Sequence, residues 1–208
     1  MNELNFEPML VGVAGGSGGG KTTLAQALVE EANDVHGCET ALILELDRFY
    51  RPKADAPHER VTNFDEPQAL DFDLLSTTLA NLISAGRVDI PIYDFARHDR
   101  IGSEMVASRP LIVVEGILAL WHPATRSSLH YRVFVDAPED LRLQRRIDRD
   151  VVHRGRRESE IRAQWNETVV PMHREYVEPT KVHADRIVDG QSNLQDVARS
   201  LLDTLDLP

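Results

Sequence analysis

The residues best suited to chemistry in this sequence form the glycine-rich run from Gly15 to Thr22. The run has a glycine, four free positions and then Gly-Lys-Thr, which is the pattern of a phosphate-binding loop. Glycine lets the backbone turn its N–H groups inward onto anionic oxygens, while Lys21 can reach the β and γ phosphates of a nucleotide and Thr22 a magnesium ion. The predicted loop comprises Gly15, Gly16, Ser17, Gly18, Gly19, Gly20, Lys21, Thr22 and Thr23.

The segments on either side of the run favour a phosphate-binding loop over the alternative, a flexible glycine-rich linker. Residues 9–14 are a short apolar run typical of a buried strand, and residues 22–35 have the period of an amphipathic helix. Strand, loop and helix follow one another in the order that such a loop requires. The apolar face of the expected helix consists of Leu24, Leu28, Val29, Ala32 and Val35.

Two acidic residues stand where predicted strands end. Asp47 follows an expected strand at residues 39–46, and Glu115 ends an apolar run at residues 110–114. In open parallel sheets, ligands bind outside the carboxyl ends of the strands, so both side chains should face the crevice beside the glycine run. Asp47 is then a candidate base and Glu115 a candidate metal carboxylate. The alternatives are an Asp47 that caps a turn and a Glu115 with a structural role.

Arginine is concentrated in one segment of an otherwise acidic chain. Seven arginines lie within the sixteen residues from Arg142 to Arg157. Such a cluster fits a lid that neutralises a phosphoryl group during transfer. The alternative is a solvated helix face on which the arginines pair with nearby acids. The members are Arg142, Arg145, Arg146, Arg149, Arg154, Arg156 and Arg157.

The rest of the chain alternates between strand and helix signals. A hairpin is expected at about residues 88–108, with Pro91 confining its first strand to an edge, and Asp136 is placed to cap the helix after it. Four strands alternating with helices predict an α/β fold, namely a P-loop NTPase-type doubly wound parallel sheet with a substrate-binding β-hairpin and an arginine-rich helical lid. We expect one domain over residues 1–208, with the lid at about 138–160. The other expected elements are helices at 70–85, 158–177 and 193–205 and strands at 104–107, 131–135 and 187–188.

Composition narrows the class of protein further. The 208 residues, 42% of them hydrophobic, are enough to bury a core without disulfides, and the formal charge of −11 argues against binding to nucleic acid or an anionic membrane. No apolar run reaches the length of a membrane span, and the N-terminal residues lack the features of a secretion signal. The single cysteine, Cys38, allows no intrachain disulfide. We therefore expect a cytoplasmic protein, and the sequence leaves a homo-oligomer open.

Several kinds of nucleotide-binding protein share a glycine loop of this type. A GTPase switch would need a guanine-reading Asn-Lys-x-Asp element, which this sequence does not contain. A motor or transporter ATPase is usually larger and has further signature motifs. A small-molecule kinase needs a phosphate loop, an acidic base, a metal carboxylate and an arginine lid, and candidates for all four are present.

With these residues identified, the chain resembles the uridine kinase (uridine-cytidine kinase) family over most of its length. The order and spacing of the matching segments agree throughout. Kinases of phosphoribulose, pantothenate and nicotinamide riboside share the scaffold and remain alternatives. The matching segments are residues 12–23, 63–65, 90–95 with His98 and Arg100, 114–118, 134–136, 145–150, 154–156, 171–172 and 178–181.

The resemblance implies an activity and a set of roles. The activity is ATP-dependent phosphorylation of the 5′-hydroxyl of uridine, and of cytidine, in pyrimidine salvage, with ATP as donor and Mg²⁺ as cofactor. Asp47 resembles the family's catalytic base, and Thr22 and Glu115 resemble its magnesium environment. The positions that match nucleoside-binding residues are Asp65, Tyr93, Phe95, His98, Arg146, Arg156 and Gln164, and those that match ATP-binding residues of the lid are Arg149 and Arg154.

Two positions depart from the family pattern. Arg48 follows the expected base where the family usually has a small residue, and Gly19 occupies a position that is often serine. A cation beside Asp47 would lower its basicity unless it points away. A nucleotide-binding regulator without transfer activity is therefore an alternative from a different class. Tyr93 and Phe95 also alternate as residues of any half-buried strand would.

Overall fold

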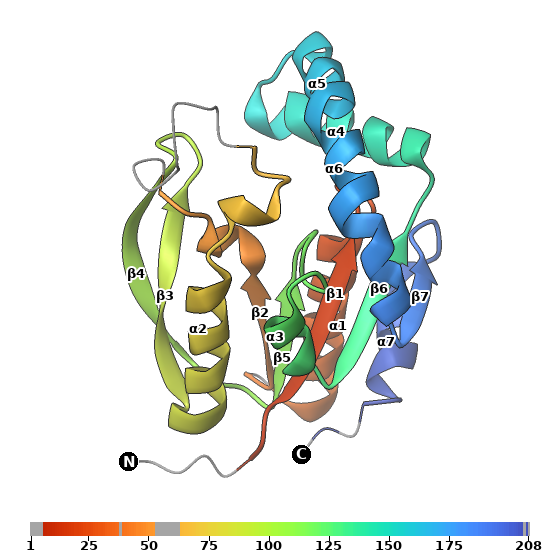
Figure 1. Cartoon of the computed structure of the whole chain (residues 1–208). Helices are drawn as coiled ribbons and strands as arrows, with labels where there is room; N and C mark the ends of the chain where they lie inside the picture. The colour runs from red at the N-terminus through yellow and green to blue at the C-terminus, as the bar shows by residue number, and fades with distance from the viewer. Residues whose placement is uncertain (1–5, 38, 53–62, 206, 208) are drawn as a thin grey trace.

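The main sheet has five parallel strands (Figure 1). The structure is a computed structural model that describes residues 6–37, 39–52, 63–205 and 207. The spatial order of the strands is β2-β5-β1-β6-β7, with β1 at the centre between β5 and β6. The fifth parallel strand is the one expected at residues 187–188. The strands are β1 (Met9–Gly15), β2 (Ala41–Glu45), β5 (Leu111–Glu115), β6 (Tyr131–Asp136) and β7 (Arg186–Asp189).

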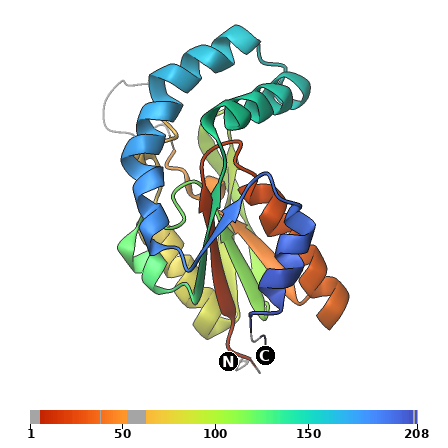
Figure 2. The same ribbon diagram turned by 90° about the vertical axis from the view of Figure 1, so that its right-hand side faces the viewer.

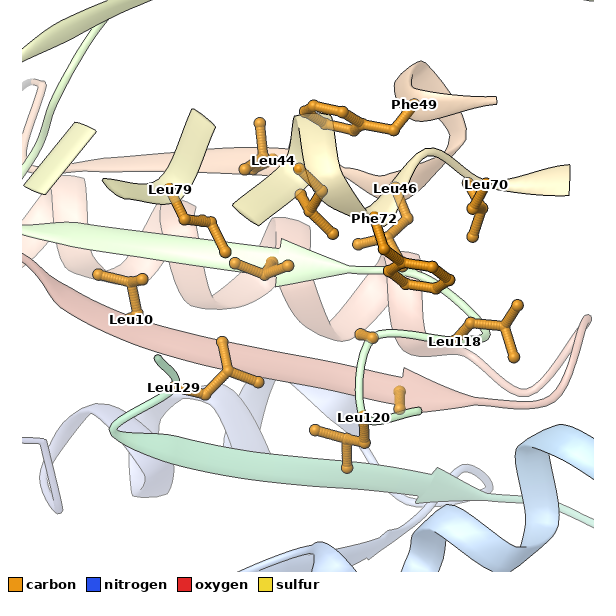
Figure 3. Close-up of a cluster of buried hydrophobic side chains, with 14 of the residues drawn as sticks. Leu10, Leu44, Leu46, Phe49, Leu70, Phe72, Leu79, Leu118, Leu120 and Leu129 are labelled. Carbon is orange, nitrogen blue, oxygen red and sulfur yellow. The ribbon is translucent and has the colours of Figure 1, made fainter. Parts of the chain in front are cut away.

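Helices cover both faces of this sheet, as the sequence predicts for a doubly wound fold (Figure 2). Helices α1 (Lys21–His36) and α7 (Leu194–Leu202) pack on one face, and α2 (Phe72–Ala85) and α3 (Pro123–Ser127) lie on the other. Each face has its own buried cluster, of Val, Leu and Ala on the α1 side and of aliphatic and aromatic side chains on the α2 side. Figure 3 shows the cluster on the α2 side, where Leu79 of α2 lies over the sheet.

The expected hairpin is a separate two-stranded antiparallel sheet beside α2. Its strands are β3 (Arg87–Asp94) and β4 (Asp99–Ala107), so the return strand begins earlier than the predicted residues 104–107. The turn closes early because the Asp94 carboxylate accepts hydrogen bonds from the backbone N–H groups of Ala96 and Arg97. Both strands are edges, which accommodates the missing N–H of Pro91.

The arginine-rich segment forms a helical arm over the carboxyl ends of the strands (Figure 1). Helix α4 (Glu139–Arg154) ends at Gly155, whose φ of 62° is left-handed, and α5 (Glu158–Gln164) turns back from there. The helix expected at residues 158–177 is present but irregular. After α5 it continues through η4 (Trp165–Val169), α6 (Val170–Met172), η5 (His173–Val177) and η6 (Glu178–His183), of which η4 and η5 are π-helical.

Three sequence expectations about local structure are wrong. Val35 is 60% exposed, because it lies near the end of α1, beyond the sheet that the helix covers. Asp136 does not cap α4, since Pro138 occupies the N-cap position without a side-chain hydrogen bond and the Asp136 carboxylate pairs with Lys181 instead. The strand expected at residues 39–46 is shorter, because the chain turns into η1 (Leu46–Phe49).

None of the helices within the described ranges has both the length and the apolar character that crossing a membrane requires.

Replacing Leu79 by alanine should lower the free energy of unfolding by about 2–5 kcal/mol, because this fully buried side chain would leave a cavity between α2 and the sheet. Urea unfolding measures the change from the midpoint and slope of the transition. The control is Val35→Ala at the exposed end of α1, which should stay within about 0.5 kcal/mol of the parent. Equal destabilisation by the two variants would contradict the packing described here.

Candidate functional site

The glycine loop connects the end of β1 to the first residue of α1. Gly18 and Gly20 have φ values of 76° and 105°, a region that side chains other than glycine rarely adopt. The turn is closed by a hydrogen bond of 2.9 Å from the Gly19 N–H to the Gly16 carbonyl oxygen. The free N–H groups of the first turn of α1 therefore follow directly on the loop, an arrangement suited to binding an anion.

Two cavities adjoin the loop. The first, which we name the loop cavity, has a volume of about 980 Å³ and lies between the glycine loop, α4 and the β7–α7 connection. The second, the hairpin cavity, has a volume of about 410 Å³ and lies between the loop, η1, the hairpin turn and the helical arm. Lys21, Thr22 and Arg149 line both cavities. A ligand in one cavity would thus meet a ligand in the other at these three side chains.

Most of the residues selected from the sequence line these two cavities, and four do not. The hairpin cavity is lined by Ser17, Lys21, Thr22, Asp47, Asp65, Phe95, His98, Glu115, Arg146, Arg149, Arg154, Arg156 and Gln164. The loop cavity adds Gly18, Gly20 and Thr23. Gly15, Gly16, Gly19 and Tyr93 line neither, and these glycines contribute the backbone course of the loop instead.

The carboxylate of Glu115 lies beside the first residues of α1. The Thr22 hydroxyl donates a hydrogen bond of 3.2 Å to Glu115 Oε1, and Lys21 Nζ lies 3.5 Å from the same oxygen. The parallel pairing of β1 with β5 produces this contact, since it brings the end of β5 alongside the start of the loop. The Glu115 carboxylate is therefore held by a hydroxyl and an ammonium group at the shared wall of the two cavities.

Asp47 lies at the wall of the hairpin cavity, where solvent in the cavity reaches its side chain. Protein surrounds the carboxyl on its other sides. The loss of hydration and the nearby negative charge of Glu115 raise its pKa from 3.8 to about 6, against the opposing effect of Lys21. A carboxyl with this pKa is largely ionised at neutral pH and a stronger base than an ordinary aspartate.

Arg48 does not pair with Asp47. Its Nε donates a hydrogen bond of 2.8 Å to the Pro91 carbonyl oxygen, and its guanidinium forms an ion pair of 2.6 Å with Glu104. The side chain therefore points from η1 to the hairpin. Because its guanidinium pairs with the hairpin and not with Asp47, Arg48 does not lower the basicity of Asp47 by forming an ion pair with it.

An aromatic cluster forms one side of the hairpin cavity. Tyr50, Phe64, Tyr93 and Phe95 contact one another, and His98 contacts Phe64. The ring centroids are 4.8 Å apart for Tyr50 and Phe64 and 5.2 Å apart for Phe64 and His98. Tyr93 packs behind this wall, and its buried hydroxyl makes no hydrogen bond within the described part of the chain. The sequence analysis missed Tyr50 and Phe64 as cavity residues, although Phe64 stands in the matching segment 63–65.

Asp65 is the other carboxylate of the hairpin cavity and is buried. Burial raises its pKa, and the positive charges of Arg146 and Lys21 act in the opposite direction. A buried carboxylate that faces a cavity is an acceptor for hydroxyl or N–H groups of a ligand.

The arginines of α4 and its C-terminal end are mostly not a solvated face. Arg146 is buried and donates hydrogen bonds to Ser17 Oγ at 2.9 Å and to Gln164 Oε1 at 3.0 Å. Arg142 is also buried, with its guanidinium 5.4 Å from the centre of the Trp165 ring. Arg157 fits the alternative, since it is exposed and pairs with Glu160. The solvated-face alternative therefore holds for Arg157 but not for the buried Arg142 and Arg146, and the lid stays a prediction.

The connection between β7 and α7 also belongs to the site, which the sequence analysis missed. Arg145 donates a hydrogen bond of 3.0 Å to the Gly190 carbonyl oxygen and one of 3.4 Å to that of Gly19. This arginine thus joins α4, the glycine loop and the β7–α7 connection. The available signal was the glycine at position 190, three residues before the N-cap residue Asn193.

The residues beside the loop fit a magnesium ion that is bound together with phosphates. No group of three or more His, Cys, Asp and Glu side chains gathers as a metal cage within the described ranges. Mg²⁺ rarely needs such a cage, because it keeps several waters and is bound by one or two protein oxygens and by substrate phosphates. The Thr22 hydroxyl and the Glu115 carboxylate, 3.2 Å apart, supply oxygens of this kind.

Comparison with known proteins agrees with this arrangement. Residues 10–197 match the model of the phosphoribulokinase / uridine kinase family. The chain is 42% identical over 190 residues to a uridine kinase of Chloroflexus aggregans, covering 90% of this chain and 89% of that protein. It is 41% identical over 202 residues to a uridine kinase of Ligilactobacillus salivarius, covering 95% and 92%. The structure of phosphoribulokinase from Rhodobacter spheroides has a TM-score of 0.60 and 14% identity, covering 89% of this chain and 73% of that one, so it shows a shared fold.

Replacing Gly190 by alanine should weaken nucleotide binding by about tenfold or more, because the new β-carbon would lie 2.3 Å from the Gly19 carbonyl oxygen and displace the loop. Titration calorimetry with ATP measures the change in Kd. Gly102→Ala on β4 is the matched control, since its β-carbon would meet no atom within 4 Å. Equal Kd values for the two variants would mean that the β7–α7 connection does not hold the loop in place.

Proposed function

Because the chain belongs to the phosphoribulokinase/uridine kinase family, we propose that it transfers the γ-phosphoryl group of ATP to the 5′-hydroxyl of uridine. The activity is that of a nucleoside kinase, and its expected role is pyrimidine salvage. Curated relatives of about 40% identity over nearly the whole chain are uridine kinases. Cytidine is the second acceptor that we propose. We also propose a cytoplasmic location, which the single cysteine supports.

One observation carries this proposal. The loop cavity and the hairpin cavity meet at Lys21 and Thr22, and Asp47 lies in the wall of the hairpin cavity. A donor whose phosphates lie along the glycine loop would present its terminal phosphate at this junction. An acceptor in the hairpin cavity would then have its hydroxyl between that phosphate and the Asp47 carboxylate, so that the carboxylate can accept the proton as the oxygen attacks the phosphorus.

We assign ATP to the loop cavity. The N–H groups of the glycine loop and of the first turn of α1 would bind its phosphates, Lys21 the β and γ phosphates, and Arg149 and Arg154 the terminal phosphate from the side of the arm. Thr22 and Glu115 would hold Mg²⁺. This ion, when bound, neutralises charge that develops on the phosphate oxygens.

We assign the nucleoside to the hairpin cavity. Its volume of about 410 Å³ is within the range of small-molecule sites. Asp65 would accept hydrogen bonds from the ribose hydroxyls. The rings of Phe95 and His98 would hold the pyrimidine, with Tyr93 packed behind Phe95 as support. Arg146, Arg156 and Gln164 would close the nucleoside in from the arm.

The aromatic cluster favours a nucleoside over the other acceptors used in this family. A sugar phosphate such as phosphoribulose presents hydroxyl and phosphate groups but no ring that could stack on Tyr50, Phe64 and Phe95. A pyrimidine presents such a ring. The cluster thus supports a nucleoside as the acceptor, and the similarity to uridine kinases favours uridine or cytidine among nucleosides.

The roles of the remaining groups follow from this placement. Asp47 would accept the proton of the 5′-hydroxyl as it attacks the phosphorus, a task that needs orientation more than strong basicity. The arm from Arg142 to Arg157 would act as a lid that excludes water, which otherwise competes with the ribose hydroxyl. Its position over the carboxyl ends of the strands supports this role (Figure 2).

Release of ADP in a coupled assay tests the proposed function. We expect turnover with uridine, and with cytidine, and much slower turnover with nicotinamide riboside, pantothenate and ribulose 5-phosphate. Turnover mainly with one of the last three would assign a different acceptor to the hairpin cavity. Binding of ATP without turnover on any of the five would instead favour a nucleotide-binding regulator.

Asp47→Asn should lower kcat by about a hundredfold or more while uridine and ATP still bind, because a positioned proton acceptor is lost. In the parent, kcat/KM should fall as the pH decreases through about 6, because the raised pKa leaves the base protonated below that value. The surroundings disfavour the charged carboxyl, so above pH 6 the neutral asparagine should not lower Tm. The control is Asp34→Asn on the exposed face of α1. Near-parental turnover by the Asp47 variant would show that another group is the base.

A further inference from the structure

Asp150 has surroundings that the proposed function does not use. It lies in the last turns of α4 and has no exposed surface, although its side chain is a carboxylate. Four arginines surround its two carboxylate oxygens. The nitrogen-to-oxygen distances are 2.8 Å for Arg149, 3.3 Å for Arg156, 3.5 Å for Arg154 and 3.8 Å for Arg146.

A single carboxylate cannot form equally strong ion pairs with four guanidinium groups. Burial alone would raise the pKa of Asp150, but the hydrogen bond from Arg149 and the charges of Arg149, Arg154 and Arg146 lower it below its ordinary value. The carboxylate is therefore charged at neutral pH. The four guanidinium groups compete for it, and the two longest distances, to Arg154 and Arg146, belong to the weakest contacts.

The four arginines face different parts of the site. Arg149 lines both cavities and approaches the glycine loop from the side of the loop cavity. Arg154 lines the hairpin cavity, where its charge acts on Asp47. Arg146 and Arg156 also line the hairpin cavity, and they share Gln164 Oε1 as an acceptor, at 3.0 and 2.9 Å. A single carboxylate thus connects arginines near the expected phosphates with arginines near the expected nucleoside.

We propose that Asp150 is a positioning residue through which ATP and the nucleoside strengthen each other's binding. Phosphate oxygens would draw Arg149 and Arg154 away from the Asp150 carboxylate. The carboxylate would then interact more strongly with Arg146 and Arg156. These two arginines are then held more firmly against the nucleoside, and the effect is reciprocal because binding free energies are linked. The proposal rests on the proposed function and adds to it a coupling between the two substrates.

A purely structural role for this residue predicts something different. The backbone carbonyl of Asp150 accepts hydrogen bonds from the N–H groups of Gly155 and Arg156, which close the end of α4. Asparagine keeps these backbone bonds and nearly the same shape. A substitution by asparagine therefore removes the charge and leaves the helix end intact.

The experiment measures the Kd of uridine with and without a non-hydrolysable ATP analogue in the full chain. In the parent, the analogue should tighten uridine binding by about fivefold or more, a typical size for coupling between sites. In Asp150→Asn the ratio of the two Kd values should fall close to one while each ligand still binds. The matched control is Asp148→Asn, an exposed aspartate of the same helix that pairs with Gln144, and it should keep the parental ratio.

A parental ratio in Asp150→Asn would overturn the proposal, and so would a parent protein without coupling. If Asp150→Asn does not fold, Asp150→Glu replaces it, since glutamate keeps the charge but displaces it by one methylene. The ratio should then lie below that of the parent, and an unchanged ratio would again overturn the proposal.

A parent that binds no uridine would contradict the proposed function and not this inference. Hydrogen exchange with the ATP analogue alone then decides the role of Asp150. The analogue should increase protection of residues 156–164 in the parent and in Asp148→Asn but not in Asp150→Asn. Equal protection in all three proteins would overturn the inference.

Discussion

The rest of this structure depends on the close packing of backbone around the glycine loop. A β-carbon on Gly15 would lie 2.3 Å from the Val135 carbonyl oxygen, and one on Gly18 would lie 2.2 Å from that of Arg142. The loop can keep its course only where these positions lack side chains. The end of β6 and the start of α4 are therefore placed against the loop by contact, and the arm that α4 begins must extend over the carboxyl edge of the sheet.

Charged side chains gather at the carboxyl edge of the sheet, where carboxylates lie close to one another and to cations. The parallel register brings Glu115 beside Lys21 and Thr22, and η1 brings Asp47 to the same region. The proximity of the two carboxylates helps raise the pKa of Asp47 to about 6. Across the cavity, Asp150 holds four arginines that would otherwise repel one another. The Glu115 and Asp150 carboxylates are thus held by cationic partners that line the two cavities.

Much of the fold follows from local patterns that the sequence displays. The strand before the glycine run, the helix after it, and the end of α2 at residue 85 were all predicted in place, because apolar periodicity acts over a few residues. The misplaced features have long-range causes. Asp136 pairs with Lys181, 45 positions away, instead of capping α4, and Val35 has the helical period but lies beyond the sheet.

The sequence by itself determined the phosphate loop, the fold class and the residue types of the site, since these depend on spacing within short segments and on resemblance across the chain. Only the tertiary structure decided which way the side chains point. Arg48 reaches Glu104 on the hairpin instead of Asp47, and Tyr50 contacts Tyr93 to build the aromatic wall. Periodicity does not encode contacts between residues more than forty positions apart, because packing of separate elements selects them.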